Sequence, residues 1–319
     1  MSGQSSGLVA MGLAFAVAST LLTNVGILFQ KLSADTEADK PLCSRWRFWL
    51  GFTLNLGSEA GLTTAALALA PMSVIAPLGG LSVVFNALLA RFGVLPGIRE
   101  EMSRRDWAST ACILVGVVAV AYCGPAGVDP ATYNATLVAD LPAAFAQPVF
   151  VGYAAVSVAI VLAWLALWKG GACVGALRPY TPRADSQAAA FGSSLTAALC
   201  AGFSTVFLKV LALALSEYLS ARRLPGPVVP ICGAALLVCA PLQLYLLNMT
   251  LASGTASFTI PLYLSLTMIL TSACGGVLFS EFTIVLERAP RPLYLCGYLC
   301  AVVVVLLGLV ALSSSQVIA

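Results

Sequence analysis

Long apolar runs alternate with short polar segments along the whole chain. A helix needs roughly 20 mainly apolar residues to cross about 30 Å of hydrocarbon, and nine runs approach that length. They cover residues 7–30, 47–70, 73–96, 107–123, 148–168, 188–209, 227–249, 255–279 and 293–313. No soluble domain fits between them. We therefore predict an all-α, multi-pass membrane protein of nine transmembrane helices, the first of them uncleaved.

The composition agrees with a lipid environment. Of the 319 residues, 60% are hydrophobic and 9% are charged, whereas a soluble domain has roughly 25% charged residues. Histidine is absent, and with it the commonest metal ligand and the usual general base near neutral pH, so we expect no enzyme. No basic patch with interleaved aromatics points to nucleic acid. No Gly-rich Walker loop is present either, so any transport must use existing gradients.

The distribution of basic residues predicts the orientation. The loops after the first, third and fifth predicted spans hold four, four and three Lys or Arg residues, and the loops after the second and fourth hold none. By the positive-inside rule the N-terminus is outside and the C-terminus is cytoplasmic. We expect the protein to reside in the plasma membrane or an endomembrane. Arg222, Arg223, Arg288 and Arg291 oppose this assignment. Asn134 begins a glycosylation sequon in a predicted outer loop.

The two ends of the chain resemble each other. The matching pairs are Leu67-Ala68 with Leu251-Ala252, Ser73 with Ser257, Pro77-Leu78 with Pro261-Leu262, and Leu114-x-Gly116 with Leu306-x-Gly308. We predict two four-helix repeats, about 7–123 and about 188–313, joined by a central helix at about 148–168. One intervening helix inverts the second repeat, and inverted repeats are typical of alternating-access carriers with a site near the bilayer midplane. The alternative is simple similarity between Leu/Ala-rich helices.

Glu59 is the only carboxylate near the middle of a predicted span. A charge there costs roughly 2.5–3.5 kcal/mol, so it usually faces a cavity or a partner. Asn55 lies one turn before it and Ser58 beside it, which gives this span a polar stripe. The alternative is that Glu59 is a protonated, hydrogen-bonded contact between helices.

The second repeat adds neutral oxygen atoms. Gln243 is the counterpart of Glu59 at the repeat offset, and Pro77 and Pro261 free the carbonyls of the residues four positions earlier, which are Ser73 and Ser257. Free carbonyls at membrane depth are tolerated where they line a cavity. Carboxylate, amide and carbonyl oxygens suit a hard cation such as Mg²⁺, with Glu59 as the metal ligand. The alternative is that both prolines only kink their helices.

Three further polar positions are ambiguous. Lys31 and Lys209 match each other in the repeats, and we expect both side chains to snorkel to the interface. Asn24 could line the cavity or join helices.

Several short motifs point to a known family. In the first half they are Gly51, Gly57-Ser58-Glu59, Ala70-Pro71, Pro77-Leu78-Gly79 and Leu81-Ser82-Val83. In the second half they are Gln243, Tyr245-Leu246, Pro261-Leu262-Tyr263 and Leu278-Phe279-Ser280-Glu281. In these motifs the chain resembles the NIPA-type magnesium transporters of the drug/metabolite transporter superfamily. The resemblance implies a magnesium transporter with no cofactor beyond the transported ion. The alternatives are a carrier for a small organic solute and a non-transporting scaffold or receptor.

Overall fold

The computed structural model describes residues 2–37, 39–92, 103–123, 140–173, 186–221, 226–253, 256–282 and 291–316. Every regular element among these residues is a helix. The longer elements are α1 (Ser2–Thr36), α2 (Trp46–Ser58), the π-helical turn η2 (Glu59–Thr63), α3 (Thr64–Leu69), α4 (Met72–Leu78), α5 (Leu81–Phe92), α6 (Arg104–Cys123), α8 (Pro148–Cys173), α9 (Gln187–Ala221), α10 (Val228–Ser253), α11 (Ala256–Leu278) and α13 (Arg291–Gln316). A short 3-10 helix spans Leu42–Ser44.

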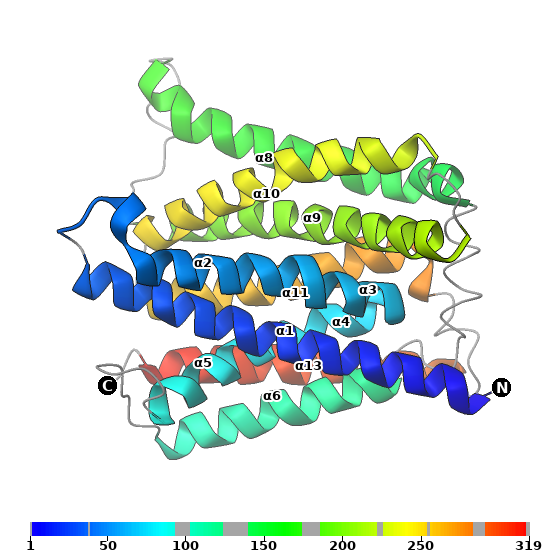
Figure 1. The fold of residues 1–319 in the computed structure, drawn as a ribbon, viewed down its shortest axis with the longest axis horizontal. Coiled ribbons are helices and arrows are strands. Elements are labelled where there is room, and N and C mark those ends of the chain that lie inside the picture. The colour runs from blue at the N-terminus through cyan, green and yellow to red at the C-terminus, as the bar shows by residue number, and fades with distance from the viewer. Residues whose placement is uncertain are drawn as a thin grey trace.

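The helices form one bundle with roughly aligned axes (Figure 1). Helices α8 and α10 lie along one edge of the bundle and α6 along the other. Helix α1 begins at one end of the bundle, and α13 finishes at the opposite end. The described helices fall on all nine apolar segments that the sequence predicts to be spans.

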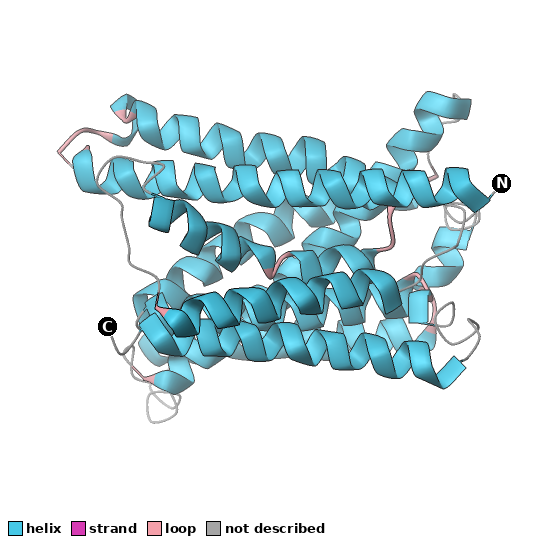
Figure 2. Cartoon of the chain, turned by 90° about the horizontal axis from the view of Figure 1, so that it is seen from below, coloured by secondary structure: helices cyan, strands magenta, loops and turns pink. Residues whose placement is uncertain are grey.

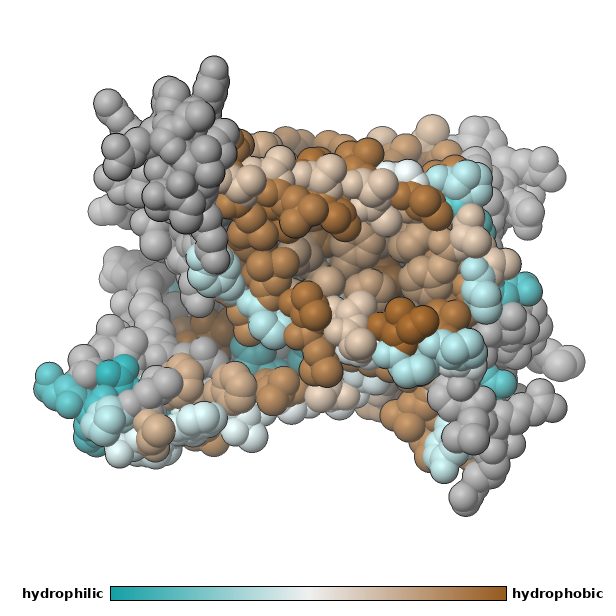
Figure 3. All heavy atoms as spheres, turned by 90° about the horizontal axis from the view of Figure 1, so that it is seen from above, coloured by the Kyte–Doolittle hydropathy of each residue, from teal (hydrophilic) through white to brown (hydrophobic). Residues whose placement is uncertain are grey.

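Five described helices are long and apolar enough to cross a membrane: Gly7–Phe29, Pro148–Trp168, Phe191–Leu219, Val228–Leu247 and Leu293–Ala311. Large apolar side chains are exposed on the outside of the bundle, such as Leu237 on α10 at 78% and Val118 on α6 at 68%. The face that includes α8 and α10 is apolar across its middle and more hydrophilic toward its ends (Figure 3). Because water disfavours contiguous apolar patches of this kind, we identify an integral, multi-pass membrane protein. The number of crossings stays a prediction.

Local sequence signals begin several helices. Ser103 and Asp106 form a capping box at the start of α6, in which each side chain accepts a hydrogen bond from the other residue's backbone N–H at 3.3 and 2.7 Å. Pro148 is the first residue of α8, a position where its missing N–H costs nothing. The Ser186 hydroxyl accepts a hydrogen bond from the Ala189 N–H just inside α9.

Helices α6 and α13 pack closely through two glycines. A Cβ atom at Gly116 would lie 2.6 Å from Val305 Cγ2 and 3.0 Å from the Val305 nitrogen. A Cβ atom at Gly308 would lie 2.7 Å from Ile113 Cγ1 and 3.1 Å from the Ile113 nitrogen. The two contacts are reciprocal, since the residue three positions before each glycine packs on the other glycine.

The predicted second and third spans are interrupted inside the bundle. The second contains the π-turn η2 and ends at Ala70, whose backbone is extended. Pro71 precedes the seven-residue α4, which begins at Met72, and a turn at Gly79 and Gly80 separates α4 from α5. Short non-helical breaks are visible within the bundle as well as at its ends (Figure 2). Helix α4 is therefore a separate segment with a break on either side.

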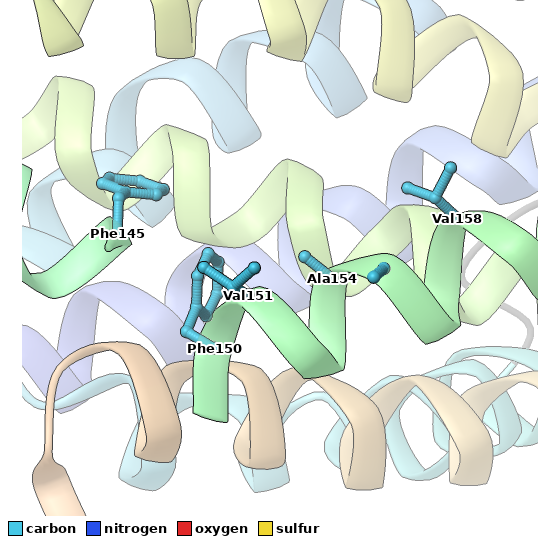
Figure 4. Close-up of a pocket in the computed structure, with 6 residues that line it drawn as sticks. Phe145, Phe150, Val151, Ala154 and Val158 are labelled. Atoms are coloured by element: carbon cyan, nitrogen blue, oxygen red, sulfur yellow. The ribbon is translucent and has the colours of Figure 1, made fainter. Parts of the chain in front are cut away.

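An apolar hollow of about 380 Å³ opens beside α8. Phe145, Phe150, Val151, Ala154, Ala155 and Val158 line it (Figure 4). None of these side chains carries an oxygen or nitrogen atom, so the hollow provides no side-chain ligand for a cation. A candidate cation site must be sought elsewhere.

Candidate cation site and a buried ion pair

Glu59 lies near the middle of the segment Trp46–Leu69, at the start of the π-turn η2. The Thr63 hydroxyl donates a hydrogen bond to Glu59 Oε2 at 3.2 Å. The glutamate side chain is exposed. Turns of π-helix inside α-helices are rare and occur frequently at functional sites.

Gln243, the predicted counterpart of Glu59, forms a hydrogen bond between two helices of the second half of the chain. Its Nε2 atom, on α10, donates a hydrogen bond to the Tyr263 hydroxyl on α11 at 3.0 Å. Tyr263 is buried. The bond thus joins α10 to α11 within the second half of the chain. In the sequence, Tyr263 appears only as the last residue of the motif Pro261-Leu262-Tyr263, with no predicted role.

Asn55 and Ser58 lie where α2 packs on α1. Ser58 is buried, and its hydroxyl donates to the Asn55 carbonyl at 2.8 Å and bonds with the Thr23 hydroxyl at 2.8 Å. Ser19 donates to the Ser58 carbonyl and bonds with the hydroxyl of Thr63. The Asn55 side chain is half-buried. Much of the predicted polar stripe thus joins two helices, and Thr63 links this network to Glu59.

Asn24 also joins helices. Its Nδ2 atom donates to Ser82 Oγ at 2.9 Å, and the Ser82 hydroxyl bonds with Asn24 Oδ1 at 3.1 Å. These contacts connect α1 with α5. Of the two roles that the sequence left open for Asn24, the structure supports the interhelical one.

The carbonyl that Pro77 frees does not line a cavity, contrary to expectation. Pro77 lies inside α4, and the Ser73 carbonyl accepts a hydrogen bond from the Tyr298 hydroxyl of α13 at 2.9 Å. Both Ser73 and Tyr298 are buried. The freed acceptor is therefore satisfied by protein. A distant tyrosine reaches it, which the local sequence around Pro77 does not reveal.

Two other predicted positions are only partly described. Ser257 and Pro261 lie in the first turns of α11, whose backbone alone is described there. Asn134 lies outside the described residues. Within the described part of the chain, no group of three His, Cys, Asp or Glu residues could hold a metal ion. A Mg²⁺ ion that keeps its waters requires only one or two carboxylates.

A buried ion pair lies between α9 and the residues that follow α11. Lys209 Nζ is 2.7 Å from Glu281 Oε1, and both side chains are 0% exposed. The ammonium group also lies 4.5 Å from the centre of the Phe279 ring, a favourable cation–π distance. The expectation that Lys209 snorkels to the interface is therefore wrong, because α9 is largely buried at the centre of the bundle.

The Glu281 carboxylate also holds the start of α4. Its Oε1 accepts the Met72 N–H at 2.8 Å, and its Oε2 accepts the Ser73 N–H at 2.6 Å. Ser280, the residue before it, has a φ of 53°, the left-handed region that serine rarely adopts. This local conformation turns the chain after α11 and lets it present Glu281 to α4. In the sequence, Glu281 is visible only as the last residue of the motif Leu278-Phe279-Ser280-Glu281.

The fold is a helical bundle with an apolar outer surface. It holds a carboxylate within a π-turn and an ion pair at its centre. These features define a polytopic membrane protein with a polar interior. The sequence model of the family described as Magnesium transporter NIPA matches residues 8–316. The chain belongs to this family, which confirms the resemblance seen in its motifs.

Curated relatives agree at low identity. The chain is 23% identical over 273 residues to a "Probable magnesium transporter NIPA7" of Arabidopsis thaliana, a match that covers 84% of this chain and 74% of the relative. It is 21% identical over 283 residues to "Magnesium transporter NIPA3" of Homo sapiens, covering 85% of this chain and 63% of the relative. The chain thus spans less than two thirds of the human relative. No solved structure matches it.

Proposed function

We propose that this protein moves Mg²⁺ across a membrane and that Glu59 binds the ion. The observation that carries the proposal is the placement of this exposed carboxylate in a π-turn of a predicted span. A lone anionic group inside a membrane protein is expensive and usually functional. Family membership over nearly the whole chain gives the cargo its identity.

The polar groups near Glu59 suit a hydrated cation. Mg²⁺ releases its waters reluctantly and is commonly held through one or two carboxylates. Glu59 would contact the ion or its water shell, while Gln243 and Tyr263 offer an amide oxygen and a hydroxyl from the other half. Asn55 and the Ser257 carbonyl complete the proposed lining. The Ser73 carbonyl does not belong to it, because Tyr298 occupies it.

The membrane potential suffices to drive uptake. One charge crossing 100 mV gains about 2.3 kcal/mol, so a divalent ion gains roughly 4.6 kcal/mol. Because about 1.4 kcal/mol corresponds to a factor of ten, the potential sustains roughly a thousandfold accumulation. Transport would then be electrogenic and independent of ATP.

We further propose that two inverted repeats, about 7–123 and about 188–313, alternate around this site. The reciprocal contacts of Gly116 and Gly308 support a two-fold relation, since these glycines correspond in the two repeats. The opposite positions of the first and last helix ends support an odd number of crossings (Figure 1). The N-terminus would lie outside and the C-terminus in the cytoplasm.

The test is Mg²⁺ uptake by purified protein in liposomes under an imposed potential. Glu59→Gln preserves the side-chain shape and the bond from Thr63 but removes the charge, so uptake should be lost while the protein folds normally. Glu217→Gln near the end of α9 is the matched control and should retain uptake. Full uptake by Glu59→Gln would make that carboxylate structural. An unaltered protein that exchanges an organic solute but moves no divalent cation would establish the alternative carrier.

A further inference from the structure

Helix α4 is held mainly by residues from the other end of the chain. Glu281 accepts both of its first N–H groups, and Tyr298 donates to its Ser73 carbonyl. The Met72 side chain lies directly over Gly275 of α11, where an added Cβ would be 2.8 Å from Met72 Cγ. Although α4 follows α3 in sequence, it is therefore docked on the second half of the bundle.

The position of α4 affects the segment that carries Glu59. The π-turn leads into α3, which ends at Leu69, and α4 begins at Met72. Only Ala70 and Pro71 separate the two helices, so a shift of α4 must move the end of α3. A displacement of α4 that follows the loss of the Glu281 hydrogen bonds would thus be passed to the Glu59 segment through the backbone.

Overall stability gives little reason for a buried ion pair here. The desolvation of two charges offsets much of their attraction, and well-packed apolar residues often replace such a pair without loss. Breaking one partner is costly, however, because an uncompensated charge remains inside. The free energy of such a pair therefore differs strongly between the state in which the two charges touch and the state in which they are apart. This property suits a contact that must form and break. The breaks on either side of α4 allow it to move as a unit.

We propose that Lys209 and Glu281 form a latch that fixes α4, and with it the Glu59 segment, and that the latch opens and closes in each transport cycle. The proposal rests on the proposed transport function. Both residues are positioning residues: they hold the cation-binding segment without touching the ion. Lys209 keeps the Glu281 carboxylate charged and oriented, and Glu281 holds the two backbone amides.

Hydrogen–deuterium exchange of the purified protein tests the latch directly. In Glu281→Gln and in the uncharged double variant Lys209→Met/Glu281→Gln, peptides over residues 72–78 should exchange at least about tenfold faster, since exchange follows the free energy of local opening. Peptides from α6 and α9 should keep the rates of the unaltered protein. Lys209→Arg keeps the charge and should keep the protection of α4.

A matched control comes from the pair of Glu37 and Lys40, which are 3.8 Å apart, with the Lys40 side chain 55% exposed. Lys40→Met also neutralises a paired lysine, and α4 exchange should not change. Unchanged α4 exchange in the double variant would overturn the latch. An equal rise in every helix would also overturn it, since the pair would then be a general stabiliser.

Transport kinetics separate positioning from ion binding. A carrier passes through both states in every cycle, so destabilising one state about tenfold slows the step into it by up to the same factor. The double variant should lose about tenfold in maximal rate with a Mg²⁺ KM within about twofold of the unaltered value. A parallel loss of apparent affinity would instead make the pair a ligand and would overturn the proposal. An unaltered protein that moves no Mg²⁺ would refute the proposed function, and α4 exchange would still decide whether the latch exists.

Discussion

The close contact between α6 and α13 gives a sharp stability prediction. Gly116→Ala and Gly308→Ala each add one methyl group to a helix–helix interface. At Gly116 the new carbon would lie 2.6 Å from a Val305 methyl, 3.0 Å from the Val305 nitrogen and 3.1 Å from the Ala301 carbonyl oxygen. At Gly308 it would meet Ile113 Cγ1 at 2.7 Å and the Ser109 carbonyl oxygen at 3.1 Å. The side-chain carbons can rotate away, but the backbone atoms cannot.

The expected magnitude follows from these distances. The helices must separate by a few tenths of an ångström, and overpacking of this kind costs about 1–3 kcal/mol. Alanine gains up to about 1 kcal/mol over glycine from helix propensity. Gly152→Ala on α8 isolates that gain, because a Cβ at Gly152 has no atom within 4 Å. Each interface variant should therefore be less stable than Gly152→Ala by about 1–3 kcal/mol.

The assay is reversible unfolding in mixed micelles of a mild detergent and SDS, followed by helix content. The two interface variants should lose similar amounts of stability, because their contacts are reciprocal. The double variant should lose less than the sum, since one separation of the helices relieves both sites. If either single variant is as stable as Gly152→Ala, the interface is looser than these distances imply and the reasoning fails.

Three further outcomes are expected. Tyr298→Phe removes the donor to the Ser73 carbonyl and should destabilise the protein by about 1–3 kcal/mol in the same assay. Tyr122→Phe, at a site 67% exposed, should be nearly neutral. Equal effects of the two variants would contradict the role of the Tyr298 hydrogen bond. Reporter tags at the two termini should lie on opposite sides of the membrane, and tags on the same side would exclude an odd number of crossings. Uptake should rise with an inside-negative potential and persist without ATP, and uptake that ignores the potential would exclude electrogenic transport.

The fold class was accessible from the sequence because lipid imposes a simple requirement. Each crossing needs a long apolar run, and the described helices fall on the predicted runs. Helix α8, for example, begins at Pro148, the first residue of the predicted span 148–168. The family was accessible because motifs such as Pro77-Leu78-Gly79 survive at low overall identity. Helix interruptions were harder to predict. The break at Pro71 coincides with a predicted loop, but the π-turn at Glu59 leaves no signal in an apolar pattern.

The centre of the bundle was the least predictable part. Lys209 looked like a snorkelling residue because only its own helix was considered, whereas its partner comes 72 positions later. Glu281 lies just beyond an apolar run, where a carboxylate usually meets water, and its burial depends on the left-handed turn at Ser280. The role of Tyr298 likewise depends on how two distant helices approach. Such pairings follow from tertiary packing, which a single sequence does not specify.

The π-turn changes the phase of the helix that contains it. Each residue advances an α-helix by about 100°, so one extra residue in a turn rotates every later side chain by about that angle. Before the turn, the buried face of α2 packs on α1, and after it α3 packs against both α1 and α9. Because of the extra residue, this segment packs first on α1 and then also on α9, which belongs to the second half of the chain. Glu59 lies at the point of this change, where the helix no longer continues along one partner. Deleting a single residue there would restore a continuous helix and leave the carboxylate facing a different neighbour.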